Sequence, residues 1–86
     1  MPEISRFYGV SIKMYYNEHA PPHFHAEYGD DEVLINIYTL GVIQGKMTSR
    51  ALGLVVEWAS LHQNELGQVW ERARNQEPLG KIAPLK

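Results

Sequence analysis

Residues 52–73 read LGLVVEWASLHQNELGQVWERA, and this stretch carries the clearest periodic signal of the 86-residue chain. Residues that are apolar, apart from one histidine, recur there at intervals of three and four, which is the spacing of one face of an α-helix. The resulting stripe consists of Leu52, Val55, Ala59, His62, Leu66, Val69 and Ala73, widened by Leu54, Trp58, Leu61 and Trp70. The pattern predicts a helix docked on another layer rather than a coiled coil, because three heptads with Ala and His in the seam bind weakly.

Signals at both ends set the limits of this helical segment. The hydroxyl of Thr48 or Ser49 is a suitable N-cap. Pro78 cannot continue a helix, so the segment is expected to end about two residues before it. A break near residues 62–64, with Asn64 capping a second helix, stays open as an alternative to one continuous helix.

Upstream of the helix, the hydrophobic pattern alternates with a period of two, which is typical of β-strands. We expect a long first strand over residues 4–16, with its even-numbered positions facing the core. Further strands are expected over residues 23–28, 32–38 and 42–46. Gly29, Asp30 and Asp31 supply turn residues between two of them. All connections are short, so an antiparallel meander is the natural topology.

Together these elements predict one α+β domain spanning residues 1–86. It would comprise a β-sheet half (1–47), a helical half (48–77) and an extended tail (78–86). The expected architecture is a three- to four-stranded antiparallel sheet with one or two helices packed on one of its faces. Residues 1–47 carry three basic and six acidic side chains, a net charge of −3, whereas the remainder carries +1.

The composition excludes several classes of function. The chain has no cysteine, which rules out disulfides, zinc ribbons and thiol nucleophiles. Its net charge is −2, so no overall cationic field attracts nucleic acid or membrane. No apolar run approaches the roughly 20 residues of a membrane span, and a cytoplasmic location is expected. A core this small needs good packing, a metal site without thiolates, or a partner chain, which includes a second copy of itself.

The candidate chemistry lies on the second strand. His23, His25 and Glu27 alternate along it and are therefore expected on one open face of the sheet. Two imidazoles two positions apart can bind one divalent ion such as Zn²⁺, and Glu27 or His19 could complete three ligands. The same three alternating residues are the candidate catalytic residues, since histidine transfers protons near neutral pH.

Three interpretations of this face stay open: a solvated surface, a binding surface for protein or nucleic acid, and a metal or acid–base site. Lys13, Tyr15 and Asn36 are candidate binding residues on or beside the face. Arg50, at the start of the helical segment, is a further candidate because helix N-termini attract phosphate. The sequence shows neither a glycine-rich phosphate loop nor a nucleophile elbow.

Several motifs resemble one known family. They are ISRFYG (residues 4–9), MYYNEH (14–19), PPHFHAEYG (21–29), RAL (50–52), EW (57–58) and WE (70–71). These residues are similar to the prokaryotic family of domains of unknown function numbered 4160, and the resemblance covers nearly the whole chain. Thr48 stands where the family usually has a proline after the fourth strand, which leaves helix initiation to the hydroxyl cap.

The resemblance implies a small bacterial protein that works beside a second small protein, in arrangements similar to toxin–antitoxin pairs. We therefore expect an interaction or regulatory module that binds a partner protein, forms homo-oligomers, or does both. Nucleic acid would be contacted through the complex. The alternative is a small metal- or histidine-dependent hydrolase, such as a nuclease, that uses the face of His23, His25 and Glu27.

Overall fold

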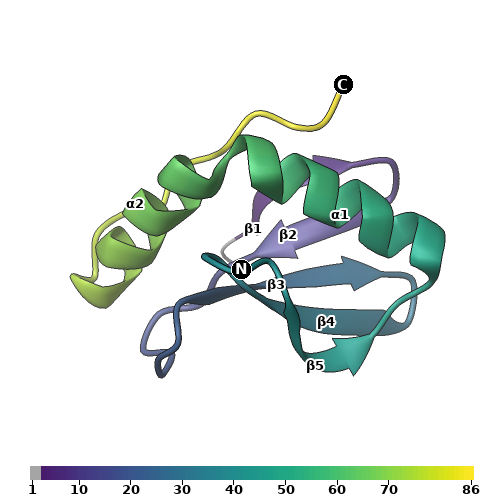
Figure 1. The fold of residues 1–86 in the computed structure, drawn as a ribbon. Helices are drawn as coiled ribbons and strands as arrows, with labels where there is room; N and C mark the ends of the chain where they lie inside the picture. The colour runs from purple at the N-terminus through teal and green to yellow at the C-terminus, as the bar shows by residue number, and fades with distance from the viewer. Residues whose placement is uncertain (1–2) are drawn as a thin grey trace.

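The computed structural model describes residues 3–86, which form a five-stranded antiparallel sheet covered on one face by two helices (Figure 1). The strands are β1 (Glu3–Phe7), β2 (Val10–Lys13), β3 (His23–Tyr28), β4 (Asp31–Asn36) and β5 (Val42–Lys46), and they lie in chain order across the sheet. The helices are α1 (Ser49–Leu61) and α2 (Gln63–Arg74). The predicted α+β meander is confirmed, with more strands than expected.

The additional strand comes from the first segment, where the prediction of one strand over residues 4–16 is wrong. β1 and β2 form a hairpin whose two-residue turn is Tyr8-Gly9, with φ values of +49° and +83°. Positive φ at both turn positions matches the right-handed twist of the strands that such a turn joins. Phe7 then lies opposite Val10, and both side chains face the core. The core therefore receives Phe7 in place of the expected Arg6 and Tyr8, whereas Val10, Ile12 and Met14 are buried as expected.

The β4–β5 pair depends on a glycine. Gly45 has φ +88° and lies opposite Val33 in the register. A Cβ atom added to Gly45 would lie 2.1 Å from the backbone oxygen of Glu32, far inside van der Waals contact. Only glycine allows the two strands to approach this closely.

The core lies between the sheet and the helices. Its largest fully buried side chain is Trp58 of α1, whose ring lies 5.4 Å from Phe7 and 5.9 Å from Phe24. Most of the predicted helical stripe is buried in the core, which confirms that the helices dock through it. Its buried residues include Val55, Ala59, Leu66, Val69, Trp70 and Ala73. Leu61 departs from it: its side chain is 66% exposed at the last residue of α1.

The helical half contains two helices rather than one. Thr48 caps α1, because its hydroxyl accepts a hydrogen bond from the Ala51 amide at 3.3 Å. His62 separates the helices and precedes α2 without a side-chain cap, so Asn64 does not have the capping role expected of it. The side-chain amide of Gln63 holds the junction against the sheet, since its Nε2 donates hydrogen bonds to the carbonyl oxygens of Ile37 and Tyr38 at 3.0 and 3.1 Å.

The tail after α2 has no regular secondary structure and returns along β1. The Ile82 amide donates to the Ile4 carbonyl at 2.8 Å, and Ile82 is buried in the core. The indole of Trp58 donates to the Ala83 carbonyl at 2.8 Å. The tail thus covers the outer edge of β1. Neither helix in the described part of the chain has the length and apolar character needed to cross a membrane.

Candidate functional site

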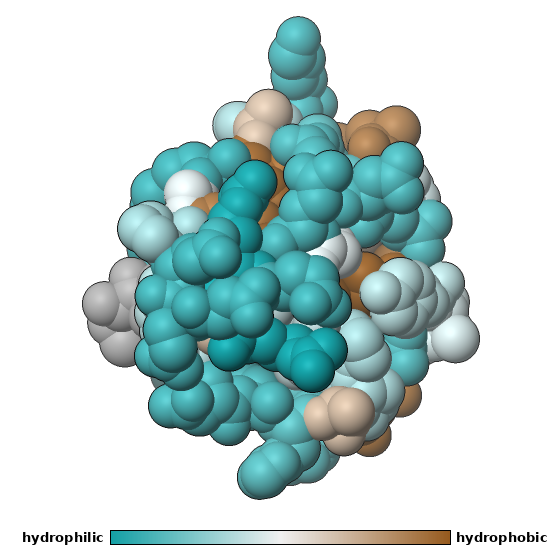
Figure 2. Space-filling view, turned by 90° about the vertical axis from the view of Figure 1, so that its left-hand side faces the viewer, coloured by the Kyte–Doolittle hydropathy of each residue, from teal (hydrophilic) through white to brown (hydrophobic). Residues whose placement is uncertain are grey.

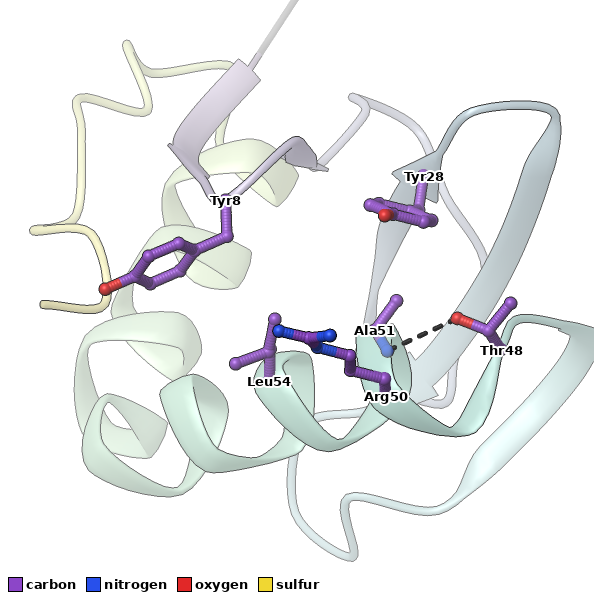
Figure 3. A pocket seen from close by; sticks show the side chains of 6 residues that line it. All are labelled: Tyr8, Tyr28, Thr48, Arg50, Ala51 and Leu54. Carbon is purple, nitrogen blue, oxygen red and sulfur yellow. Dashed lines mark hydrogen bonds between the residues drawn. The ribbon is translucent and has the colours of Figure 1, made fainter.

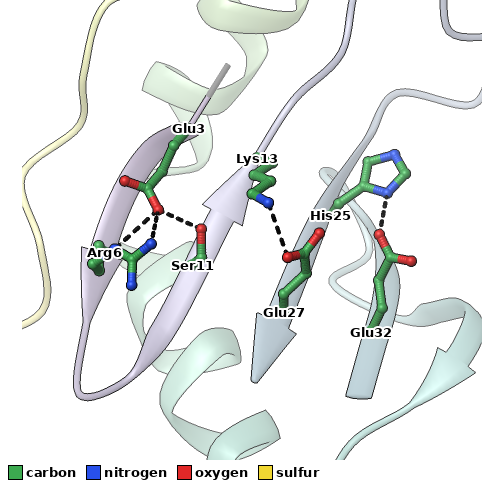
Figure 4. A network of polar contacts seen from close by, with 7 residues as sticks. All are labelled: Glu3, Arg6, Ser11, Lys13, His25, Glu27 and Glu32. Carbon is green, nitrogen blue, oxygen red and sulfur yellow. Dashed lines mark hydrogen bonds and ion pairs between the residues drawn. The ribbon is translucent and has the colours of Figure 1, made fainter. Parts of the chain in front are cut away.

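The face of the sheet opposite the helices carries a row of charged side chains (Figure 4). Lys13 of β2 and Glu27 of β3 form an ion pair, with Nζ 2.9 Å from Oε1. This hydrogen bond raises the pKa of Lys13 above its ordinary value. Glu27, expected to join the histidines, is thus bound to Lys13 instead.

A second set of polar contacts lies at the β1 end of this face. The carboxylate of Glu3 accepts hydrogen bonds from the Ser11 hydroxyl and from the Arg6 guanidinium. These two hydrogen bonds, the one from Ser11 first, lower the pKa of Glu3 below its ordinary value. Arg6 and Lys13 are therefore each paired with a carboxylate, whereas Glu27 and Glu32 lie opposite each other on β3 and β4.

The histidines meet a different carboxylate. Glu18, in the loop between β2 and β3, lies beside His23 and His25, and one ligand atom from each of the three lies within 4.8 Å of the others. Glu18 Oε1 is 3.5 Å from His23 Nε2 and in contact with His25 Nε2. We call Glu18, His23 and His25 the histidine–glutamate cluster.

His23 is not on an open face, contrary to the prediction. Only 6% of its surface is exposed, because Trp70 of α2 packs over it with 5.3 Å between ring centres. Its Nδ1 lies 2.8 Å from the carbonyl oxygen of Pro21. Its Nε2 is buried and has no hydrogen-bond partner among residues 3–86.

His25 has a polar partner on each side of its ring. Nδ1 is 3.0 Å from a carboxylate oxygen of Glu32, and Nε2 faces Glu18. The ring of Tyr15 packs edge-on against His25, with centres 4.7 Å apart and planes at 89°. Burial raises the pKa of the Tyr15 hydroxyl. Tyr15, predicted as a binding residue, therefore forms one wall of the cluster.

The remaining candidates do not contribute ligand atoms to the cluster, although Asn36 lies opposite His23 in the register of β3 and β4. His19 is exposed, and it is not one of the three residues whose ligand atoms converge. Asn36 has a structural role, since its side-chain oxygen accepts hydrogen bonds from the amides of Tyr38 and Thr39 and shapes the turn after β4. Glu18 was missed because it belongs to a loop, where strand periodicity gives no information about side-chain direction.

A cleft of about 270 Å³ opens beside the cluster. It is lined by Tyr15, Asn17, Glu18, Trp70, Ala73 and Arg74. The cleft therefore shares Glu18 with the cluster, together with the aromatic neighbours of both histidines. The molecular face at the α2 end is largely hydrophilic, with only small separate apolar patches (Figure 2).

Arg50 lies in a different cavity, at the start of α1 (Figure 3). This cavity has a volume of about 490 Å³ and is lined by Tyr8, Tyr28, Thr48, Arg50, Ala51 and Leu54. Tyr28 is 40% exposed here, at the end of β3. The cavity combines one guanidinium with two phenol rings, but it shares no residue with the cleft beside the cluster.

The cluster provides two kinds of chemistry. An imidazole between two carboxylates can accept and donate a proton, as general acid–base catalysis requires. Two imidazole nitrogens and a carboxylate oxygen can also bind one metal ion. Both require access from outside, which the adjoining cleft provides.

Comparison with known proteins identifies the family. No curated protein and no solved structure matches the chain. The model of the domain of unknown function DUF4160 matches residues 9–71, a range that includes the entire histidine–glutamate cluster and both helices up to Glu71. The match thus covers most of the chain, and the protein belongs to the DUF4160 family.

Proposed function

We propose that this protein is an interaction module that binds a partner chain by adding a strand to the β5 edge of its sheet. The observation that carries the proposal is the difference between the two sheet edges. The tail covers the β1 edge through the Ile82–Ile4 hydrogen bond. The β5 edge has no neighbour beyond it in the described residues, and all five of its residues are exposed.

The exposed side chains of β5 suit a protein partner. Val42 and Ile43 are 47% and 44% exposed, and the neighbouring Tyr38 is 64% exposed. An open edge offers unpaired backbone N–H and C=O groups, and an extended segment of another chain can pair with them. A shift in register at Ile43 interrupts the strand, which favours pairing with a short segment.

The charge distribution supports contact with nucleic acid through a complex rather than by this chain alone. The chain has a net charge of −2, and the basic side chains Arg6 and Lys13 of the open face are already paired with Glu3 and Glu27. Binding to phosphates draws on free cationic side chains. We propose further that the chain works in a bacterial cytoplasmic two-protein system, similar to a toxin–antitoxin pair, in which the partner supplies the cationic surface.

Co-expression with the protein encoded next to it tests this proposal. The two chains should purify together, and Ile43→Lys should weaken the complex at least tenfold because it places a charge on the open edge. Leu61→Lys is the matched control, since Leu61 is also exposed and apolar but lies at the end of α1. Separate elution of the two chains at micromolar concentration contradicts the proposal, as does equal weakening by both variants. A homodimer in light scattering that Ile43→Lys dissolves would assign the edge to a second copy instead.

The second candidate function is a histidine-dependent hydrolase. It is favoured by the position of His25 between Glu18 and Glu32, next to a cleft. A carboxylate that accepts the Nδ1 proton orients an imidazole so that its other nitrogen can act as a general base. Hydrolysis of a model phosphodiester should then fall at least a hundredfold in His25→Gln. A wild-type rate no higher than the buffer rate contradicts this function.

A further inference from the structure

We propose that Glu18, His23 and His25 form a binding site for one divalent transition-metal ion, with Zn²⁺ as the best-matched ion. The site does not depend on partner binding, because it lies on the β2–β3 loop and β3 rather than on β5. Three contact patterns carry the inference, one for each ligand residue.

The first is the orientation of His23. A backbone carbonyl can only accept, so the contact with Pro21 places the ring proton of the neutral imidazole on Nδ1. The bare Nε2 then points toward Glu18 and His25, buried and without a hydrogen-bond partner among the described residues. A buried polar atom left unpaired is costly, and a metal ion would satisfy this one.

The second is the support of His25. Its Nδ1 lies 3.0 Å from the Glu32 carboxylate, which accepts a hydrogen bond from the ring N–H. Histidines that bind metals almost always donate their other ring N–H to a carboxylate or a backbone carbonyl. Glu32 and the Pro21 carbonyl are these two kinds of acceptor, one for each histidine.

The third is the position of Glu18 opposite both Nε2 atoms. With both Nδ1 atoms protonated, the neutral rings present lone pairs to a carboxylate, and three electron-rich atoms converge. Three electron-rich atoms this close together are stable only when a positive charge lies between them. A proton on an imidazole or a metal ion can provide that charge. A metal ion bound at this position would supply that charge and satisfy all three ligand atoms at once.

The donor set indicates which metals fit. Two imidazoles and one carboxylate are typical of Zn²⁺ and of Fe²⁺, Co²⁺ or Ni²⁺, whereas Mg²⁺ and Ca²⁺ prefer oxygen ligands. Bonds of about 2.0–2.1 Å to tetrahedral Zn²⁺ hold ligand atoms roughly 3.3 Å apart. The ligand atoms here lie within 4.8 Å, so side-chain rotations can bring them together. Three protein ligands leave one position open, and the cleft beside Glu18 gives water or substrate access to it.

Isothermal titration of the full chain, first treated with a chelator, tests the site. Zn²⁺ should bind with one-to-one stoichiometry at micromolar affinity or tighter, whereas Mg²⁺ should not bind measurably. Glu18→Gln and His25→Gln should each weaken Zn²⁺ binding at least tenfold. Glu32→Gln, which removes the carboxylate behind His25, should weaken it by about 10- to 100-fold.

The matched control is the His62–Glu65 pair at the junction of the helices. It is also a close contact between an imidazole and a carboxylate, but it has no second histidine beside it. His62→Gln should therefore bind Zn²⁺ like the wild type, and so should Ile43→Lys, the variant that blocks the β5 edge.

Two further measurements keep the test decisive. Circular dichroism verifies that each variant folds, and Glu18→Gln is the safest of them because Glu18 lies in a loop. Co²⁺ added to the wild type should give the absorption bands of a tetrahedral or five-coordinate site, and Glu18→Gln should lose them. Absence of Zn²⁺ binding to the wild type overturns the proposal, as does an equal loss in His62→Gln and Glu18→Gln.

Discussion

Gly45→Ala should be among the most damaging single-methyl changes in this protein. An L-residue in the left-handed region costs about 1–2 kcal/mol. The new Cβ would also lie 2.1 Å from the Glu32 carbonyl oxygen, so the β4–β5 pair must separate locally and lose about one backbone hydrogen bond, worth roughly 1 kcal/mol. We expect a total loss of about 2–3 kcal/mol in the free energy of unfolding.

Thermal unfolding followed by circular dichroism measures this loss. Each kcal/mol shifts the Tm of a domain of this size by about 4–8 °C, so the Tm should fall by roughly 8–24 °C. Gly53→Ala is the matched control: Gly53 lies inside α1, and a Cβ added there meets nothing within 4 Å. Alanine should stabilise that helix by up to about 1 kcal/mol. If Gly45→Ala unfolds at the wild-type temperature, the reasoning about this strand pair is wrong.

Three further outcomes follow from the fold. Thr48→Ala should lower the free energy of unfolding in urea by about 1 kcal/mol, because the α1 cap is lost. Thr48→Ser should keep most of this stabilisation, and equal losses in the two variants would contradict the capping role. Leu66→Ala should cost about 2–5 kcal/mol and Leu61→Ala less than about 0.5, because only the first side chain is buried. Since the pKa of Glu3 is lowered by folding, its carboxylate stabilises the protein above its ordinary pKa of 4.5 and less as the pH falls through the folded value. The stability difference between wild type and Glu3→Gln should therefore shrink below about pH 4.5, and a difference constant from pH 7 to 3 would exclude this linkage.

The sequence predicted those parts of the fold that depend on local periodicity. The helical stripe and three of the strands follow from it, because burial against one neighbouring layer imposes a regular spacing. The first hairpin was missed because its turn places the non-glycine residue Tyr8 at positive φ, which composition does not signal. Arg6 did indicate that one continuous strand was wrong, because it is a charged residue at a position expected in the core. The structure exposes Arg6 to solvent.

The candidate site was predicted only where it lies on a strand. His23 and His25 do converge, as expected from their alternation on β3. Alternation could not show that Trp70, far along the chain, covers His23, or that a loop brings Glu18 to both rings. Glu27 has the correct spacing along the strand, but Lys13 on the neighbouring strand binds its carboxylate. Contacts between distant segments, rather than spacing within one strand, therefore decide which carboxylate joins the histidines.

The tail that lies along β1 limits the size of any assembly built through the sheet. A sheet with two open edges can add copies at both ends and grow into a fibre. Here the Ile82–Ile4 hydrogen bond occupies one edge, so a chain that pairs through β5 leaves no second edge of its own for the next copy. If the proposed pairing at β5 takes place, the assembly should therefore end with two chains.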